Sequence, residues 1–280
     1  MITIDDKPIR VEHFNDHTPH IWIDTNLDPV SAIKWYYEDE RECMELYYVV
    51  NHIRDIFSDA YITLFLPYLP NARLDRTKQS TDQDEILTLK WFAKFINDLH
   101  FNRVITIDPH SNVSKALFDH LDCLDIHSHI DSAMIRAAEL EGINSEDFTL
   151  ITPDEGAAKR YCIADWGRPY LFGAKERDWD TRALKSYTLI GDHNLVKNHH
   201  CFIIDDIFSS GGTLRMAAEE LKKLGAKSVY AWATHTENNP IINIEPIKKL
   251  YTTDSIKHTF VNDNIDVTNV FVTIGRVEWE

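Results

Sequence analysis

Residues 201–214 read CFIIDDIFSSGGTL, and this stretch decides the fold. A short apolar run ends in two consecutive carboxylates, Asp205 and Asp206, and small residues then lead into a segment with helical periodicity. Small residues let successive backbone N–H groups converge on one anion, and a following helix N-terminus adds partial positive charge. The pattern predicts a strand, a phosphate-binding loop and a helix. The loop residues are Ser209, Ser210, Gly211, Gly212 and Thr213.

The two acids indicate what binds beside the phosphate. Carboxylates accept hydrogen bonds from sugar hydroxyls, and they also bind Mg²⁺. Successive strand residues point to opposite faces of a sheet, so Asp205 and Asp206 reach the same ligand atom only where the strand is ending. The alternative is an ordinary strand-to-helix turn with a solvated acidic end, which the specificity of the complete string disfavours.

The rest of the chain repeats this strand-and-helix pattern. Apolar runs rich in β-branched and aromatic residues occupy residues 61–66, 103–108, 148–152, 169–172, 201–205 and 228–233. Longer amphipathic segments, such as 84–99 and 212–224, separate most of them. Apolar strands alternating with amphipathic helices are typical of mostly parallel sheets flanked by helices, so the expected fold class is α/β.

The alternation runs twice along the chain, and the polar stretch 127–131 separates the two runs. We therefore expect two similar lobes, comprising residues 1–128 and 129–265, with residues 266–280 as a candidate addition to the first. The acidic stretch 38–45 is expected to be the solvated start of a helix.

Composition and charge exclude several classes of protein. Hydrophobic residues make up 44% and charged residues 26% of the 280, as in globular proteins, and no apolar run is long enough to span a bilayer. Lys and Arg number 29 against 45 Asp and Glu, a formal charge of −16, which disfavours broad nucleic-acid binding. An anionic substrate would therefore need a local cluster of basic groups or a divalent cation.

The cysteines indicate the redox environment. Cys43, Cys123, Cys162 and Cys201 lie far apart with no CxxC pair, and the first residues of the chain lack an apolar signal core. We expect a reduced, cytoplasmic chain in which the cysteines are small core residues.

Residues 203–214 resemble the phosphoribosyl-binding loop of two families, the type I phosphoribosyltransferases and the ribose-phosphate pyrophosphokinases, or PRPP synthetases. This resemblance implies that the two lobes have a type I phosphoribosyltransferase-like fold. Five further segments resemble parts of the pyrophosphokinases in the same order along the chain, and they favour that family.

Three of these segments imply roles for individual residues. Residues 66–76 (LPYLPNARLDR) are similar to the family's FPYARQDR segment, which implies that Arg73 packs on the adenine of ATP. Residues 105–111 (ITIDPHS) resemble its MDLHA segment, which implies that His110 is a Mg²⁺ ligand on the ATP side. Residues 152–161 (TPDEGAAKRY) are close to SPDAGGAKR, whose aspartate contacts metal and ribose, and this implies the same for Asp154. Lys159 and Arg160 lie too far into the expected helix to be assigned as ligands.

The two remaining segments lie on either side of the 201–214 stretch. Residues 173–179 (GAKERDW) resemble the KER element of the family's flexible catalytic loop, which implies that Lys175 and Arg177 are the catalytic cations that stabilise phosphate charge. Residues 231–240 match the family only through ATH, and LYTTDSI at 250–256 resembles its VTNTI strand. The resemblance covers roughly residues 60 to 256.

The sequence departs from the family where the substrates bind. Ser209 replaces the third aspartate of DDIIDTGGT, and residues 79–90 replace the SRxPISAK segment. The family's FPDGE segment, which reaches the nucleotide from a neighbouring subunit, aligns only with residues 14–18. The ATP-binding roles of Phe14 and Asp16 therefore rest on two matching positions.

The resemblance implies Mg²⁺-dependent transfer of pyrophosphate from ATP to the C1 hydroxyl of a ribose 5-phosphate-type acceptor, with release of AMP. In this mechanism the loop 209–213 holds the acceptor 5′-phosphate, while Asp205 and Asp206 orient its 2′ and 3′ hydroxyls. Positioning and charge stabilisation would supply most of the catalysis. The family also implies a homo-oligomer, and we expect neither a nucleic-acid nor a membrane partner.

Three alternatives stay open. In the first, the acceptor is ADP-ribose, as in phage-borne relatives that rebuild NAD, because the departures cluster near acceptor and nucleotide; the chain would then act in the host cytoplasm. The second is a type I phosphoribosyltransferase, which leaves the matching segments of the first half unexplained. The third is a non-catalytic binding subunit, which is disfavoured because the predicted cations and metal ligands are all present.

Overall fold

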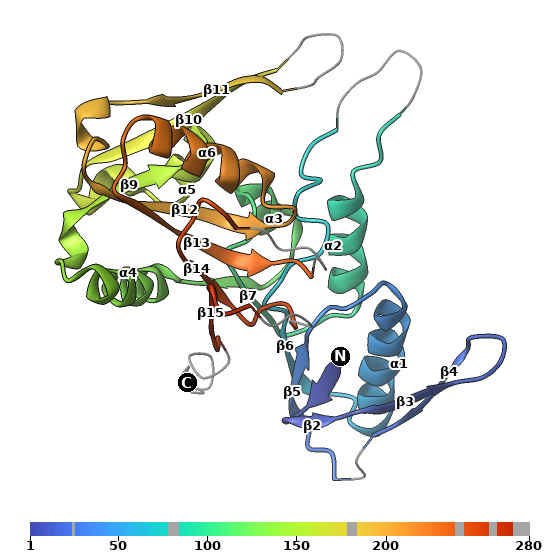
Figure 1. Cartoon of the computed structure of the whole chain (residues 1–280). Coiled ribbons are helices and arrows are strands. Elements are labelled where there is room, and N and C mark those ends of the chain that lie inside the picture. The colour runs from blue at the N-terminus through green and yellow to red at the C-terminus, as the bar shows by residue number, and fades with distance from the viewer. Residues whose placement is uncertain (24–25, 78–83, 178–183, 239–243, 258–261, 271–280) are drawn as a thin grey trace. The chain divides into compact units, whose positions relative to one another are not determined.

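A computed structural model of the chain describes residues 1–23, 26–77, 84–177, 184–238, 244–257 and 262–270 (Figure 1). The chain divides into two compact units, Met1–Asp125 and Ile126–Glu280. The boundary expected after residue 128 falls within the first turn of helix α4 (His127–Glu141). The polar stretch 127–131 thus begins a helix, because Ile130 and the residues one turn further on supply an apolar face that is buried.

The first unit contains a six-stranded sheet in the order β2-β1-β5-β6-β7-β8. Strands β5 to β8 are parallel, and β1 pairs antiparallel with β2 and β5. The strands are β1 (Ile2–Ile4), β2 (Lys7–Pro8), β5 (Val30–Trp35), β6 (Tyr61–Phe65), β7 (Arg103–Ile107) and β8 (Leu121–Leu124). Its helices are α1 (Arg41–Ile56), α2 (Thr88–Asp98) and α3 (Asn112–Leu117). A separate antiparallel hairpin consists of β3 (Arg10–His13) and β4 (Pro19–Trp22).

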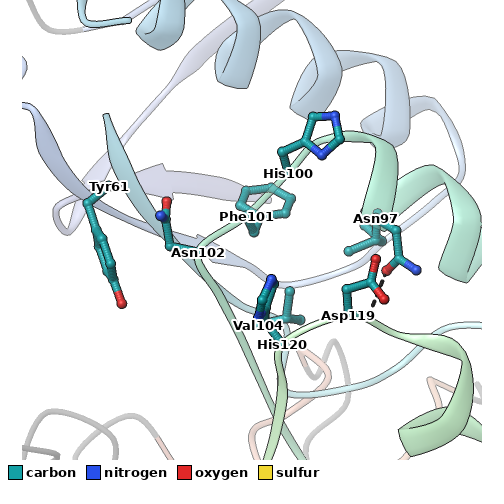
Figure 2. A pocket seen from close by; sticks show the side chains of 9 residues that line it. Tyr61, Asn97, His100, Phe101, Asn102, Val104, Asp119 and His120 are labelled. Atoms are coloured by element: carbon teal, nitrogen blue, oxygen red, sulfur yellow. Dashed lines mark hydrogen bonds between the residues drawn. The ribbon is translucent and has the colours of Figure 1, made fainter. Parts of the chain in front are cut away.

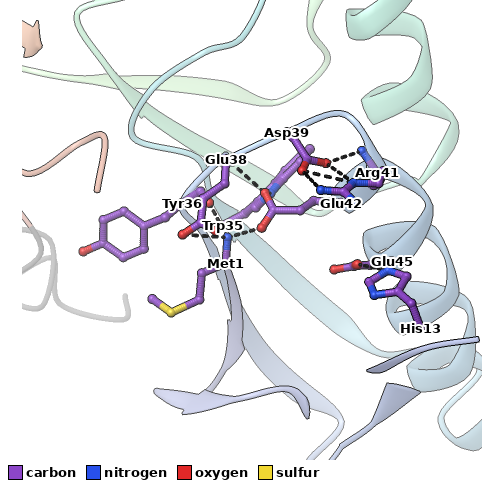
Figure 3. A network of polar contacts seen from close by, with 9 residues as sticks. All are labelled: Met1, His13, Trp35, Tyr36, Glu38, Asp39, Arg41, Glu42 and Glu45. Carbon is purple, nitrogen blue, oxygen red and sulfur yellow. Dashed lines mark hydrogen bonds and ion pairs between the residues drawn. The ribbon is translucent and has the colours of Figure 1, made fainter. Parts of the chain in front are cut away.

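The acidic segment before and within α1 is only partly solvated, which corrects the expectation for residues 38–45. Glu42 and Glu45 are each 8% exposed. One oxygen of Glu42 accepts hydrogen bonds from the indole Nε1 of buried Trp35 and from the backbone N of Glu38, both at 2.8 Å, and the Met1 amine donates to the other (Figure 3). A buried indole N–H needs an acceptor, and Glu42 supplies it from the adjoining helix.

The second unit contains a seven-stranded sheet in the order β11-β10-β9-β12-β13-β14-β15. All neighbouring strands are parallel except β11, which pairs antiparallel with β10 at one edge. The strands are β9 (Phe148–Thr152), β10 (Tyr170–Arg177), β11 (Leu184–Ile190), β12 (His200–Phe208), β13 (Ser228–Thr236), β14 (Leu250–Thr253) and β15 (Ile265–Thr268). In the described part of this unit the helices are α4, α5 (Glu155–Arg160), α6 (Gly212–Lys223) and three short 3₁₀ segments, Ser145–Asp147, Ile163–Trp166 and His193–Leu195.

Residues 266–268, a candidate addition to the first lobe, therefore lie in β15 at the edge of the second sheet. Arg136 of α4 fixes this strand, because its guanidinium donates to Asp266 and Thr268, each at 3.0 Å. The same guanidinium lies over the ring of buried Tyr251, 5.2 Å from its centroid. Residues 271–280 lie outside the described part of the chain.

The second sheet has helices on both faces, as the apolar strands predict (Figure 1). Ile203 and Val229 pack with Leu214 and Leu221 of α6 in one core cluster. On the other face the rings of Phe148 and Phe202 lie 5.6 Å apart. Tyr230, on the same face, hydrogen bonds to Glu141 of α4 at 2.7 Å. These two buried layers confirm the predicted α/β class.

The exposure of the cysteines and the length of the helices test two further expectations from the sequence. Cys201 is buried, Cys43 and Cys123 are partly buried, and Cys162 is exposed, so the expectation of a core position is wrong for Cys162. Among the residues that the structure describes, no helix is both long and apolar enough to cross a membrane.

Candidate active site

Three acidic residues of the second unit lie at the carboxyl edge of its sheet. Strands β9 and β12 are direct parallel neighbours, with Ile151 opposite Ile203. Asp154 follows β9, while Asp205 and Asp206 lie in the last part of β12. In open parallel sheets ligands bind outside this edge, so the fold brings the predicted acids to the expected place.

The acid pair is divided between the two faces of β12. The strand continues to Phe208 instead of ending at the acids, so consecutive side chains point to opposite faces. Asp206 is 3% exposed, whereas Asp205 is only partly buried. The backbone N of Asp206 donates to Oδ1 of Asp205 at 3.0 Å. The guanidinium Nη1 of Arg160 lies 2.7 Å from Oδ1 of Asp206.

The surroundings of this pair disfavour the ionised form of Asp205. Burial, followed by the negative charge of Asp206, raises the pKa of Asp205 well above its usual value, and Arg160 only partly opposes this rise. Two neighbouring carboxylates in a partly buried site repel each other unless positive charge compensates them. A hydroxyl donor, a metal ion or a cationic side chain would each lower the free energy of the doubly ionised pair.

The loop after β12 leads directly from the strand into helix α6, as the sequence predicts, and its binding of phosphate stays a prediction. Gly211 has φ +76° and is the N-cap residue of α6, whose first turn it opens. A Cβ at Gly211 would lie 2.7 Å from the ring of buried Phe208, so both its conformation and its surroundings require glycine. Ser209 and Thr213 are partly buried, and Ser210 and Gly212 are exposed at the mouth of the loop.

Asp154 has a structural task in addition to its position. It is the N-cap of α5, and its Oδ1 accepts a hydrogen bond from the backbone N of Ala157 at 2.9 Å. The adjoining Pro153 carbonyl accepts from the Tyr187 hydroxyl of β11 at 3.3 Å. Burial raises the pKa of that hydroxyl, and the charges of Asp154 and Asp205 raise it further. Tyr187 thus lies near both acids from a neighbouring hairpin.

The β10–β11 hairpin carries the two predicted catalytic cations. The backbones of Lys175 and Arg177 lie in β10, where Lys175 pairs with Tyr187 of β11. Their side chains lie outside the described part of the structure, so their roles stay predictions. Gly173 lies in β10, two residues before Lys175. A Cβ at Gly173 would lie 2.2 Å from the Tyr187 hydroxyl and 2.4 Å from the Pro153 carbonyl oxygen.

In the first unit, two predicted residues follow neighbouring strands. Arg73 lies exposed in the turns after β6, and His110 lies partly buried between β7 and α3. Strands β6 and β7 are adjacent and parallel, so both residues belong to the carboxyl edge of their sheet. Asp108, which precedes His110, is 8% exposed and has a left-handed φ of +41°.

Phe14 and Asp16 instead lie at the tip of the β3–β4 hairpin, apart from that sheet. Phe14 is 58% exposed and stacks on His20, with the ring centroids 5.6 Å apart. The hydroxyl and backbone N of Thr18 donate to Asp16 at 2.7 and 3.0 Å, and these bonds lower the pKa of the carboxyl. The turn geometry alone therefore explains Asp16, and its ATP-binding role stays a prediction.

The first unit also contains a cavity of about 240 Å³ that the sequence did not indicate (Figure 2). It lies at the amino ends of β6, β7 and β8, opposite the edge that carries Arg73 and His110. Its lining includes Tyr61, Asp119 and His120, all of which are exposed. The cavity is thus a surface depression away from the predicted ligand residues.

The donor set fits Mg²⁺ held partly by substrate. No group of three or more His, Cys, Asp or Glu side chains within the described ranges is arranged to hold a metal ion. Mg²⁺ commonly takes only one or two carboxylates and completes its coordination with water and substrate phosphates. The oxygen donors of Asp154, Asp205 and Asp206 are suited to that arrangement, because Arg160 compensates the charge of only one acid of the pair.

Three residues of this site have no role that the sequence predicts. Arg160 is expected to lie too far into its helix to be a ligand, but α5 is only six residues long and its last residue, Arg160, reaches Asp206. Tyr187 lies in no recognisable motif, and its partner is a backbone carbonyl that no sequence pattern marks. Gly173 is the first residue of GAKERDW, but nothing in this sequence indicates that the position requires a residue without a side chain.

Comparison with known proteins agrees with this geometry. A family model described as the phosphoribosyl transferase domain matches residues 169–269. The ribose-phosphate pyrophosphokinase of Vibrio cholerae is 31% identical over 238 residues, which are 84% of this chain and 70% of that protein. The chain belongs to the ribose-phosphate pyrophosphokinase family. The ribose-phosphate pyrophosphokinase of Mycoplasma genitalium is also 31% identical, over 84% of this chain and 68% of its own length.

A solved structure supports the fold independently. The phosphoribosylpyrophosphate synthetase of Mycobacterium smegmatis superposes with a TM-score of 0.76, at 19% identity, over 95% of this chain and 87% of that one. The predicted family, the fold class and the assignment as an enzyme of the ribose-phosphate pyrophosphokinase kind are therefore confirmed.

Proposed function

We propose that this enzyme transfers a pyrophosphoryl group from ATP to the C1 hydroxyl of ribose 5-phosphate, releases AMP and requires Mg²⁺. The observation that carries the proposal is the acid pair Asp205–Asp206 followed by the Gly211 turn and the N-terminus of α6, at the carboxyl edge of the second sheet. Family membership over both units supports ATP as donor and ribose 5-phosphate as acceptor.

The proposed acceptor site lies in the second unit. Backbone N–H groups of the loop 209–213 and the start of α6 hold the 5′-phosphate, which carries negative charge that a helix N-terminus stabilises. Of the two acids that flank the 2′ and 3′ hydroxyls, Asp205 accepts most of the hydrogen bonds, because Asp206 lies on the opposite, buried face of β12. Asp154 follows the neighbouring strand β9 and serves the metal and the ribose.

The proposed donor site uses residues of the first unit. The Arg73 guanidinium packs on the adenine, and His110 contributes to Mg²⁺ binding on the ATP side. Phe14 and Asp16 are further candidate nucleotide contacts, and the exposed ring of Phe14 has a free face for stacking. The metal neutralises phosphate charge when it is bound.

The reaction needs no covalent enzyme intermediate. The C1 oxygen of the acceptor forms a bond to the β-phosphorus, the bond from that phosphorus to the oxygen shared with the α-phosphate breaks, and AMP leaves with that oxygen. The C1 hydroxyl loses its proton to solvent. Lys175 and Arg177 stabilise charge on the transferring group, so catalysis consists of positioning and electrostatic stabilisation.

The acceptor has one specific alternative. ADP-ribose presents the same C1 hydroxyl and 5′-phosphate, and the serine at position 209 removes a carboxylate from the loop that would contact this phosphate. Such a reaction would give ADP-ribose pyrophosphate and would belong to NAD metabolism, in the host cytoplasm for a phage-encoded chain. Four free thiols support a reducing, cytoplasmic environment for either acceptor. We further propose a homo-oligomer, as the family resemblance implies.

The test is a side-by-side assay of AMP release from MgATP with ribose 5-phosphate or ADP-ribose, with chelation of the metal as a third arm. We expect AMP release with ribose 5-phosphate and loss of it on chelation. Higher kcat/KM with ADP-ribose would replace the proposed acceptor, and pyrophosphate release from PRPP plus a base, without AMP release, would identify a phosphoribosyltransferase.

The catalytic cations are tested by substitution. Lys175→Ala should lower turnover by about 10²- to 10³-fold, the usual effect of losing one charge-stabilising donor, with little change in folding. Lys223→Ala is the matched control, because Lys223 is an exposed lysine on α6 that pairs with Glu220 at 3.1 Å. Near-normal turnover of Lys175→Ala would refute the assigned role.

A further inference from the structure

The geometry points to Arg160 as a positioning residue for the acceptor site, an inference that rests on the proposed function. Its guanidinium forms an ion pair with the carboxylate of Asp206, and the backbone N–H of Asp206 in turn donates to the carboxylate of Asp205. Arg160 would therefore set the orientation of the hydroxyl-binding carboxylates without touching the acceptor itself.

The ion pair is built into the interior of the second unit. The side chains of Arg160 and Asp206 are 21% and 4% exposed, and Nη1 lies 2.7 Å from Oδ1. The guanidinium carbon also lies 5.7 Å from the ring centroid of Tyr161, which is 2% exposed. A pair held in this way differs from an exposed ion pair, because solvent screens it weakly and its geometry is restricted.

The position of Arg160 also links two neighbouring strands. Helix α5 begins at the N-cap Asp154, after β9, and ends at Arg160, which reaches β12. The six-residue helix thus connects the candidate metal ligand at one end with the acid pair at the other. A displacement of either end would change the distance between Asp154 and the acid pair, which the acceptor must match.

Charge gives the pair a second task. The acid pair would meet an acceptor that already carries a phosphate, in a chain with a formal charge of −16. Arg160 supplies one positive charge on the buried side of β12, where Asp206 lies, and leaves Asp205 to face the ligand. The two acids then have separate tasks, with Asp206 mainly held by protein and Asp205 mainly offered to the hydroxyls.

The test compares charge-matched substitutions on one helix. We expect Arg160→Met to raise the KM for ribose 5-phosphate by about 10- to 100-fold, the usual cost of losing a partner that orients a ligand-binding group, while the KM for ATP changes less than twofold. Arg160→Lys should restore part of this loss. Lys159→Met is the control, because this substitution removes the same charge from the same helix. Lys159 is 74% exposed and pairs with Glu155 at 2.8 Å.

A double variant separates positioning from folding. In an Asp206→Asn background Arg160→Met should have little further effect on the KM for ribose 5-phosphate, because the partner of the guanidinium is already lost. Isothermal titration of ribose 5-phosphate, without ATP, gives the same comparison as dissociation constants if a variant turns over too slowly. Equal losses for both substrates, or additive effects in the double variant, would overturn the inference.

These results stay distinct from the fate of the proposed function. If the parent chain releases no AMP with either acceptor, the proposed function fails, and the titration still decides the role of Arg160. If the parent releases AMP and Arg160→Met keeps the parent's acceptor affinity, the positioning role fails while the function stands.

Discussion

Replacing Gly173 by alanine tests the attachment of the β10–β11 hairpin to the acidic edge of the second sheet. An added Cβ would lie 2.2 Å from the Tyr187 hydroxyl, 2.5 Å from the Tyr187 ring and 2.4 Å from the Pro153 carbonyl oxygen. The carbonyl is backbone and cannot rotate away, so either β10 or the loop before Asp154 must move. Overpacking of this kind costs about 1–3 kcal/mol, and we expect the upper end, near 3 kcal/mol.

The measurement is the free energy of unfolding from urea denaturation, together with hydrogen exchange of the β10 amides. Tyr187→Phe removes only the hydrogen bond to Pro153 and should cost about 1 kcal/mol. Gly212→Ala is a stability control, since its Cβ would meet only the Ser210 hydroxyl, at 3.8 Å. A free energy of unfolding of Gly173→Ala within about 0.5 kcal/mol of the parent value, with unchanged exchange protection of β10, would refute the close contact.

Three other outcomes are expected. Gly211→Ala should raise the KM for the acceptor and destabilise the chain by roughly 1–3 kcal/mol, because φ +76° and a contact of 2.7 Å with Phe208 both oppose a Cβ; unchanged acceptor kinetics would contradict this. Burial alone would raise the pKa of Glu141, but hydrogen bonds from Lys248, Tyr230 and Ser228 lower it to about 2, so its stabilisation is complete above pH 4.5 and lost as the pH falls toward 2. The free energy of unfolding of Glu141→Gln should therefore lack a pH-dependent contribution on the order of 2 kcal/mol in that pH window. Parallel pH profiles of this free energy for parent and variant would disprove the stabilising role of Glu141. Arg136→Met should increase hydrogen exchange in β15, whereas unaltered protection there would exclude the proposed anchoring.

The sequence predicted the fold wherever burial leaves an unambiguous pattern. The apolar runs at 61–65, 148–152 and 228–233 are strands, since both faces of each sheet are covered and nearly every position must be apolar. The prediction failed where a charged residue is buried. Strand β12 continues through Asp205 and Asp206 because Arg160 compensates one of them, and Glu42 is buried because Trp35 needs an acceptor.

The candidate site also has features that the sequence predicts and features that it does not. The backbone features were predictable, because small residues after a strand, and an acid before a short helix, have local signatures at Gly211 and Asp154. The residues that orient the site were not predictable, because their partners are distant in sequence. Tyr187 meets the carbonyl of a residue 34 positions earlier, and the pairing of Arg160 with Asp206 depends on where α5 ends.

The N-cap at the start of α5 constrains how this chain can change. Because Asp154 holds the first turn of the helix through Ala157, its loss to alanine would cost stability, about 1 kcal/mol, as well as charge. Asparagine caps a helix equally well, and its codons differ from those of aspartate at one base. Drift away from activity would therefore pass most easily through asparagine at position 154, which leaves a stable fold with an uncharged edge.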